Sequence, residues 1–192
     1  MRKIVVFTNL TLDGVMQGQG RPEEDTRGGF QHGGWAVPYA AMASGMGGER
    51  SPGVTPLLMG RRTYQDFYAY WPNQGNNPYT EVLNNAPKYV ASTTLQEPLP
   101  WSNSILLKGS VAEAVAGLKA QEGADFLVMG SGVLIQTLMQ HGLIDRYVLL
   151  IHPLVLGSGR QLFPEGSTYT ALRLVDAKPT PNGVVIATYE PA

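Results

Sequence analysis

Short runs of apolar residues alternate along this chain with segments whose apolar residues recur at helical spacing. The run 126–129 leads directly into the glycine-rich turn 130–132, after which apolar residues at helical spacing continue to Gly142. A short apolar run bounded by glycine predicts a buried strand, most often in a parallel sheet. The run 54–59, followed at once by Gly60, repeats this order of strand, glycine and helix.

Further apolar runs and two local signals complete the predicted fold. The runs predict strands at residues 3–8, 88–91, 104–107, 146–151, 172–176 and 184–189. Ser110 and Glu113 form a capping box that opens another helix, and Asn182-Gly183 predicts a tight turn between the last two strands. We therefore expect a three-layer α/β fold with a mixed, mainly parallel sheet and a C-terminal antiparallel hairpin. A single domain over residues 1–192 is expected.

Segments rich in glycine, proline and polar residues predict long loops. These loops are expected at residues 15–36, 45–53, 71–86 and 152–163. A loop as long as 15–36 inside a compact domain is usually functional, and we expect it to be a lid over the open end of the sheet. Trp35 would anchor this lid, and Pro38 suits the first turn of a helix that runs to about Ser44.

Composition narrows the class of protein. Only 15% of the residues are charged and the net charge is −1, so we expect no nucleic-acid partner. The chain has no cysteine and three scattered histidines, which excludes disulfides and thiolate chemistry and argues against a metal site. It shows neither a signal peptide nor an apolar run long enough to span a membrane. We therefore expect a cytoplasmic protein with a small-molecule partner and no membrane partner.

Four motifs that carry chemically distinctive residues follow predicted strand ends. They are Leu12-Asp13-Gly14, Gly60-Arg61-Arg62-Thr63, Ser92-Thr93 and Gly130-Ser131-Gly132. Glycines let a ligand approach the backbone closely, and the start of a helix attracts an anion. Arg61 and Arg62 oppose the dipole of their helix, so an anion shared with them would explain their position. A phosphate-bearing ligand is therefore the working hypothesis.

Each motif also has a purely structural explanation. The glycines could only form tight turns, and the two arginines could be solvated side chains on a surface turn. The hydroxyls of Ser92 and Thr93 could cap a turn, as could Asp13. The dinucleotide fingerprint is also incomplete, because Ile135 replaces its third glycine. The shared position favours one ligand site, since ligands of parallel sheets bind beyond the carboxyl ends of the strands.

In this order, the motifs resemble the dihydrofolate reductase fold. They are most similar to the reductase domain of the bifunctional riboflavin-biosynthesis deaminase–reductases and its stand-alone relatives. The resemblance is carried by Leu12-Asp13-Gly14, by the segment 142–146, and by the segment 153–159 together with Phe163. It covers nearly the whole chain. The deaminase half, with its zinc-ligand motifs, is absent from this sequence.

The resemblance implies that NADPH is the cofactor. It places these residues at the cofactor: Leu12, Gly14, Gly60, Arg61, Arg62, Thr63, Ser92, Thr93, Gly130, Ser131, Gly132, Val133 and Leu134. Arg61, Arg62 and Thr63 would contact the 2′-phosphate and the pyrophosphate, and Ser92 and Thr93 would share the 2′-phosphate. The segment 130–134 would line the pyrophosphate and the nicotinamide ribose. Asn9, Leu12 and Gly14 would face the nicotinamide.

Two departures from the family pattern bear on the substrate. The segment 35–42 lacks the carboxylate that binds the pterin in dihydrofolate reductases, so dihydrofolate is a poor substrate candidate. Met129 stands where the riboflavin-pathway reductases typically carry a glutamate. Asp13 is the single candidate for a catalytic residue.

The resulting expectation is a homodimeric, NADPH-dependent reductase. It would transfer hydride to a small heterocycle, like a 5-amino-6-(5-phosphoribosylamino)uracil reductase. The alternative is a non-catalytic NADP(H)- or nucleotide-binding module that retains the fold, and a third possibility is a self-associating interaction protein. Binding of NADPH without turnover of any reducible heterocycle would distinguish the module from the enzyme.

Overall fold

A computed structural model of the chain describes residues 1–40, 54–75 and 77–192. Its strands form an eight-stranded sheet of order β4-β3-β2-β5-β1-β6-β8-β7. The predicted α/β class, with a mainly parallel sheet and an antiparallel C-terminal pair, is confirmed. The chain divides into two compact units, which are described separately. Unit 1 comprises Met1–Val5 and Arg50–Ile144, and unit 2 comprises Val6–Glu49 and Asp145–Ala192.

The described residues of unit 1 contain four strands and four α-helices. The strands are β2 (Leu57–Gly60), β3 (Lys88–Ala91), β4 (Ser104–Leu107) and β5 (Phe126–Val128). The helices are α2 (Arg61–Tyr70), α3 (Pro78–Asn85), α4 (Val111–Ala120) and α5 (Gly132–Gln140), and the 3-10 turn Trp71–Asn73 follows α2. β2 pairs in parallel with both β3 and β5, and β4 pairs in parallel with β3. Because Gly60 is in register with Ala91, and Ala91 with Leu107, the carboxyl ends of β2, β3 and β4 are level.

An aromatic core fixes α2 against the β3–β4 connection. Tyr64 is 1% exposed, and its phenol oxygen accepts a hydrogen bond from the backbone nitrogen of Trp101 at 3.0 Å. The Trp101 indole nitrogen in turn donates to the side-chain oxygen of Asn84 at 2.7 Å. Met59 and Val90 complete this core from β2 and β3. The start of α2 is therefore held by packing one turn farther along the helix.

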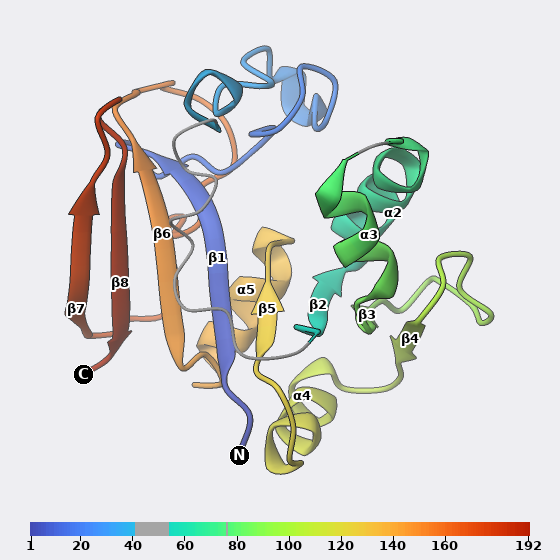
Figure 1. Cartoon of the computed structure of the whole chain (residues 1–192). Helices are drawn as coiled ribbons and strands as arrows, with labels where there is room; N and C mark the ends of the chain where they lie inside the picture. Colours follow the sequence, from blue (N-terminus) through green and yellow to red (C-terminus); the bar gives the residue numbers. More distant parts are fainter. Residues whose placement is uncertain (41–53, 76) are drawn as a thin grey trace. The chain divides into compact units, whose positions relative to one another are not determined.

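Unit 2 is built on the antiparallel strands that end the chain (Figure 1). β6 (Arg146–His152) pairs with β8 (Val185–Pro191), and β8 pairs with the edge strand β7 (Leu172–Pro179). The β7–β8 turn contains Gly183 at φ +86°. The predicted hairpin is confirmed. β1 (Ile4–Thr11) runs through both units, and two short 3-10 turns, Arg27–Gly29 and Val37–Tyr39, interrupt the loop that follows it.

The prediction of a loop over 71–86 is wrong, because α3 forms within it. Asn77 caps α3 by accepting a hydrogen bond from the Tyr79 nitrogen at 2.9 Å, and Pro78 occupies the first turn. Asparagine followed by proline is therefore a helix start here, not a helix breaker. The helix predicted from Pro38 to Ser44 begins as a 3-10 turn, and its remainder from residue 41 lies outside the described residues, as does loop 45–53.

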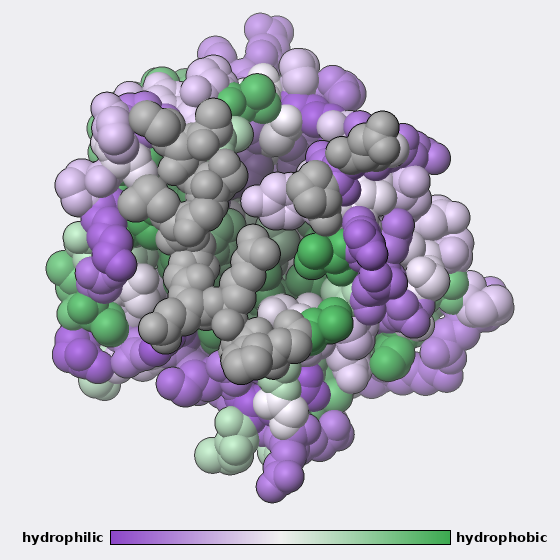
Figure 2. All heavy atoms as spheres, viewed as in Figure 1, coloured by the Kyte–Doolittle hydropathy of each residue, from purple (hydrophilic) through white to green (hydrophobic). Residues whose placement is uncertain are grey.

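One face of the surface mixes the two kinds of side chain. Figure 2 shows hydrophilic and apolar side chains interspersed on it, as is usual for protein surface in water. In the part of the chain that the structure describes, none of the helices is long and apolar enough to cross a membrane.

Candidate functional site

The carboxyl ends of β2 and β5 meet in unit 1. The Gly60 nitrogen donates a hydrogen bond to the Gly130 carbonyl oxygen at 3.3 Å. A Cβ on Gly60 would collide with the Ser131 hydroxyl, and a Cβ on Gly130, whose φ is +150°, would lie 2.7 Å from the Thr63 hydroxyl oxygen. Both glycines are therefore required by the protein's own close packing. This finding supports the tight-turn explanation for Gly130.

Two helices begin at this junction without N-terminal caps. In α2 and α5, neither Gly60 nor Ser131 caps the helix with its side chain, and the first turn holds no acidic residue. The other two α-helices of unit 1 differ, since Asn77 and Ser110 cap α3 and α4 and each first turn contains a glutamate. Free N–H groups and the positive dipole ends of α2 and α5 are thus available at one place, and that combination favours an anion.

The arginines of the second motif stand in the first turn of α2. Arg61 is partly exposed and Arg62 is exposed, and neither forms an ion pair with a residue of the described ranges. Within the last motif, Val133 is 64% exposed, whereas Leu134 is 5% exposed and belongs to the core. Two guanidinium groups with no ion-pair partner in the described ranges, beside two open helix starts, form a cationic patch.

The end of β3 adds hydroxyl groups next to this patch. Ser92 caps the following turn, because its hydroxyl oxygen accepts from the nitrogens of Thr94 at 3.1 Å and Leu95 at 3.0 Å. This is the turn-capping use that the sequence left open. The Ser92 hydroxyl also lies 3.5 Å from the Thr94 hydroxyl, and either of the two can be the donor. Thr93 is exposed. Lys108 follows β4 on the same level and pairs with Glu97 at 2.7 Å; sequence reasoning missed it, although its place after a strand end was a signal.

Asp13, in unit 2, is occupied by structural hydrogen bonds. Its carboxylate accepts from the Thr11 hydroxyl at 2.5 Å and from the backbone nitrogens of Gly157 at 2.8 Å and Leu156 at 3.2 Å. Burial alone would raise the pKa of Asp13, but these bonds outweigh it and lower the pKa below its usual value. Asp13 therefore stays ionised at neutral pH and ties the segment that follows β1 to the segment that follows β6. Leu12 is 66% exposed beside it.

Gln17 also connects the segment that follows β1 to the segment that follows β6. This contact was not predicted from the sequence. The Gln17 side chain is 5% exposed and donates to the carbonyl oxygens of Asp25 and Arg27 while accepting from the Arg160 nitrogen at 2.9 Å. The Trp35 indole donates to its carbonyl oxygen at 2.7 Å. Loop 15–36 is therefore an ordered structure that Trp35 anchors as expected. Its function as a lid stays a prediction.

A buried histidine was also missed. His152, at the end of β6, is 1% exposed, and its Nε2 lies 2.8 Å from the side-chain oxygen of Asn9 in β1. The rings of Trp35 and Tyr39 meet its imidazole edge to face. Burial lowers the pKa of His152 to about 4, so the side chain is neutral at physiological pH. In the sequence, the one signal for His152 was its position as a polar residue at the end of an apolar strand.

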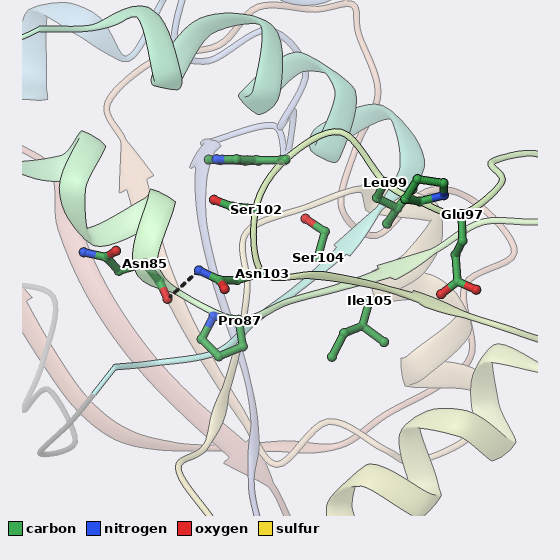
Figure 3. A pocket seen from close by; sticks show the side chains of 10 residues that line it. Asn85, Pro87, Glu97, Leu99, Ser102, Asn103, Ser104 and Ile105 are labelled. Atoms are coloured by element: carbon green, nitrogen blue, oxygen red, sulfur yellow. Dashed lines mark hydrogen bonds between the residues drawn. The ribbon is translucent and has the colours of Figure 1, made fainter.

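A hollow of about 730 Å³ lies elsewhere in unit 1, beneath the β3–β4 connection (Figure 3). Its apolar lining includes Pro87, Leu99 and Ile105, and the buried Ser104 hydroxyl has no hydrogen-bond partner within the described ranges. None of the predicted site residues lines it. The structure thus gathers Gly60, Arg61, Arg62, Thr63, Gly130 and Ser131 at one junction of unit 1, with Ser92 and Thr93 one strand away, whereas Leu12, Asp13 and Gly14 belong to unit 2.

Comparison with known proteins identifies the class. The chain belongs to the RibD C-terminal domain family, whose model matches residues 2–186. It is 28% identical over 194 residues to the uncharacterized protein YyaP of Bacillus subtilis strain 168, covering 98% of this chain and 94% of that protein. A second B. subtilis protein, YwjB, is 36% identical over 63 residues, a third of this chain. Membership of this family supports a reductase role.

Solved structures show the same fold at low sequence identity. A Shewanella sp. PV-4 protein named for riboflavin biosynthesis aligns with a TM-score of 0.67 at 23% identity, over 99% of both chains. Dihydrofolate reductase of Enterococcus faecalis, complexed with NADP(H) and RAB-propyl, aligns at 0.59 and 14%, over 98% and 96% of the two chains. A pyrimidine reductase-like protein of Corynebacterium diphtheriae aligns at 0.62 and 13%, over 100% and 92%. The resemblance drawn from the motifs is confirmed.

Proposed function

We propose that this protein is an NADPH-dependent reductase that transfers hydride to a small heterocycle of the pyrimidine ribose-phosphate kind. When bound, NADPH supplies the hydride. The protein's task is therefore to bind and orient the cofactor and the substrate, and to exclude water. The observation that carries the proposal is the pair of uncapped helix starts, α2 and α5, joined by the bond from Gly60 to Gly130. The capped helices α3 and α4 of the same unit show that an open start is not the rule in this chain.

The donor set at this junction fits a ligand with several phosphates. The first turn of α5, which begins at Gly132 after Ser131, offers backbone N–H groups. Arg61 and Arg62 add two positive charges. Planar guanidinium groups match phosphate geometry. We assign the 2′-phosphate to the arginines together with Ser92 and Thr93, and the pyrophosphate to the helix starts and Thr63.

Asp13 has a positioning role in this proposal. Its oxygens already accept hydrogen bonds from Thr11, Leu156 and Gly157, so the carboxylate carries no proton to give at neutral pH. It holds together the two loops that carry Leu12 and Val155, whose side chains are 66% and 70% exposed. We propose that these apolar side chains face the substrate. A homodimer and a cytoplasmic location remain part of the proposal; sedimentation of the purified chain tests the first.

Oxidation of NADPH in the presence of 5-amino-6-(5-phosphoribosylamino)uracil tests the function. We expect turnover with NADPH and little with NADH. The occupied carboxylate of Asp13 favours the alternative of a non-catalytic NADP(H)-binding module. Tight NADPH binding with no oxidation by this substrate, by its dephosphorylated form or by dihydrofolate would establish that alternative. Absence of NADPH binding would overturn both.

A further inference from the structure

Asn9 and His152 form a side-chain pair between neighbouring strands of unit 2. Nε2 of His152 lies 2.8 Å from Oδ1 of Asn9, although 143 residues separate the two in sequence. The edge-to-face contacts of Trp35 and Tyr39, with ring centroids 5.1 Å and 5.0 Å from the imidazole, hold the histidine ring in one orientation. Asn9 itself is half-buried, and its backbone nitrogen donates to the Gln19 side chain at 3.2 Å.

The surroundings decide which way the hydrogen bond runs. Nδ1 of His152 is buried and has no hydrogen-bond partner among the residues that the structure describes. If Nε2 accepted from Asn9, the imidazole proton would sit on Nδ1 as a buried N–H with no acceptor, which is costly. With the proton on Nε2, His152 donates to Oδ1 of Asn9 and leaves only a lone pair unmatched. The amide nitrogen Nδ2 of Asn9 therefore points away from His152.

Nδ2 of Asn9 is available to donate a hydrogen bond to a ligand. Nδ2 of Asn9 makes no hydrogen bond to any residue of the described ranges, and the side chain is not fully enclosed. We propose that Asn9 binds a ring carbonyl oxygen of the substrate, and that His152 is a positioning residue that holds the Asn9 amide with its donors outward. The inference rests on the proposed reductase function for the identity of the ligand as a heterocycle. If the inference is right, Asn9 makes the site prefer a ring that carries a carbonyl oxygen to a ring that carries an amino group.

Two small pyrimidines that differ in this chemistry test the assignment. Uracil presents carbonyl oxygens, whereas 2,4-diaminopyrimidine presents amino groups at the same ring positions. Saturation-transfer NMR on the full chain without cofactor compares their affinities in wild type, Asn9→Ala and Asn9→Asp. We expect wild type to prefer uracil by about tenfold, Asn9→Ala to lose the preference and Asn9→Asp to reverse it, since one hydrogen bond is gained or lost. Asn73→Ala, an exposed asparagine of unit 1, is the matched control and keeps the preference.

The role of His152 has its own readout. A long-range ¹⁵N–¹H correlation spectrum is expected to show a neutral imidazole with its proton on Nε2, both with and without uracil. His152→Phe removes the donor and is expected to abolish the preference for uracil, and His152→Gln, which retains an amide donor, is expected to restore part of it. A proton on Nδ1 would overturn the inference, as would an unchanged preference in Asn9→Asp or no transfer to either ring in wild type. Because no cofactor is present, these outcomes are independent of whether NADPH binds.

Discussion

Replacing Lys88 by methionine is predicted to destabilise the protein by about 3 kcal/mol. Lys88 has no solvent exposure, and its ammonium donates to the carbonyl oxygens of Asn84 at 3.1 Å, Ala86 at 2.8 Å and Ser102 at 3.0 Å. Nζ also lies 4.4 Å from the ring centroid of Trp101. The lysine thus joins the end of α3 to the β3–β4 connection. Methionine keeps an apolar stem of similar length but leaves all three carbonyl groups without this donor.

The magnitude is the difference between two opposing terms. Three hydrogen bonds from a charged donor contribute roughly 1.5–3 kcal/mol each, about 4–9 kcal/mol together. Burial opposes them, since it lowers the pKa of Lys88 from 10.5 to about 8, which corresponds to about 3 kcal/mol at neutral pH. The net loss is therefore about 1–6 kcal/mol, centred near 3 kcal/mol.

Urea denaturation of wild type and Lys88→Met at pH 7 measures this difference. Lys178→Met is the matched control, because Lys178 is exposed and pairs with the exposed Asp176 at the sheet edge, and its effect is expected to stay within about 0.5 kcal/mol. Between pH 8 and 10.5 the unfolded chain binds more protons at Lys88 than the folded chain does. Wild type is therefore expected to gain stability over Lys88→Met as the pH rises through this range. A Lys88→Met variant as stable as the control would refute the reasoning.

Three further predictions concern His152, Asp13 and Gly132. The folded-state pKa of His152 is lowered by burial to about 4 from 6.5. Wild type is therefore expected to lose about 3 kcal/mol relative to His152→Gln as the pH falls from 6.5 to 4, and parallel stability curves for the two proteins would contradict this. Asp13→Asn is expected to cost about 1–3 kcal/mol at pH 7, and because the folded-state pKa of Asp13 is lowered, the deficit is expected to shrink in acid denaturation series as the carboxylate protonates. Gly132→Ala is expected to maintain or raise the melting temperature, since alanine favours the helix, while weakening NADPH binding at the α5 start; full affinity in the variant would mean that no phosphate contacts this residue.

The strands could be predicted because their signals are local. β3 and β4 begin and end at the predicted residues, since each is a short apolar run between breakers. Where the signal has two physical meanings, the sequence misleads. Asn77-Pro78 forms a helix cap in α3, although the same pair is common in loops. Only the packing of the finished unit decides between the two.

The candidate site shows the same limit. The strand-end motifs of Gly60 and Gly130 were visible because glycine and arginine at a strand end are unusual in themselves. The connecting side chains were not visible, because Gln17 and Asn9 reach their partners Arg160 and His152 across 143 residues. The local sequence around a polar residue does not indicate which distant group will be its hydrogen-bond partner. Asp13 was found, but its contacts to Leu156 and Gly157, and hence its role, come from tertiary structure.

Titration of the wild-type protein with NADPH and NADH tests the central claim most directly. The two cofactors differ by one phosphate, which the proposal places against Arg61, Arg62, Ser92 and Thr93. We expect NADPH to bind more tightly, and we expect Arg61→Ala or Arg62→Ala to weaken NADPH about ten- to a hundredfold while at least one of them leaves NADH nearly unchanged. Arg173→Ala, an exposed arginine of β7, is the charge-matched control and leaves both affinities unchanged. Equal affinity of the wild type for NADH and NADPH, or equal losses for both cofactors in both arginine variants, would contradict the account.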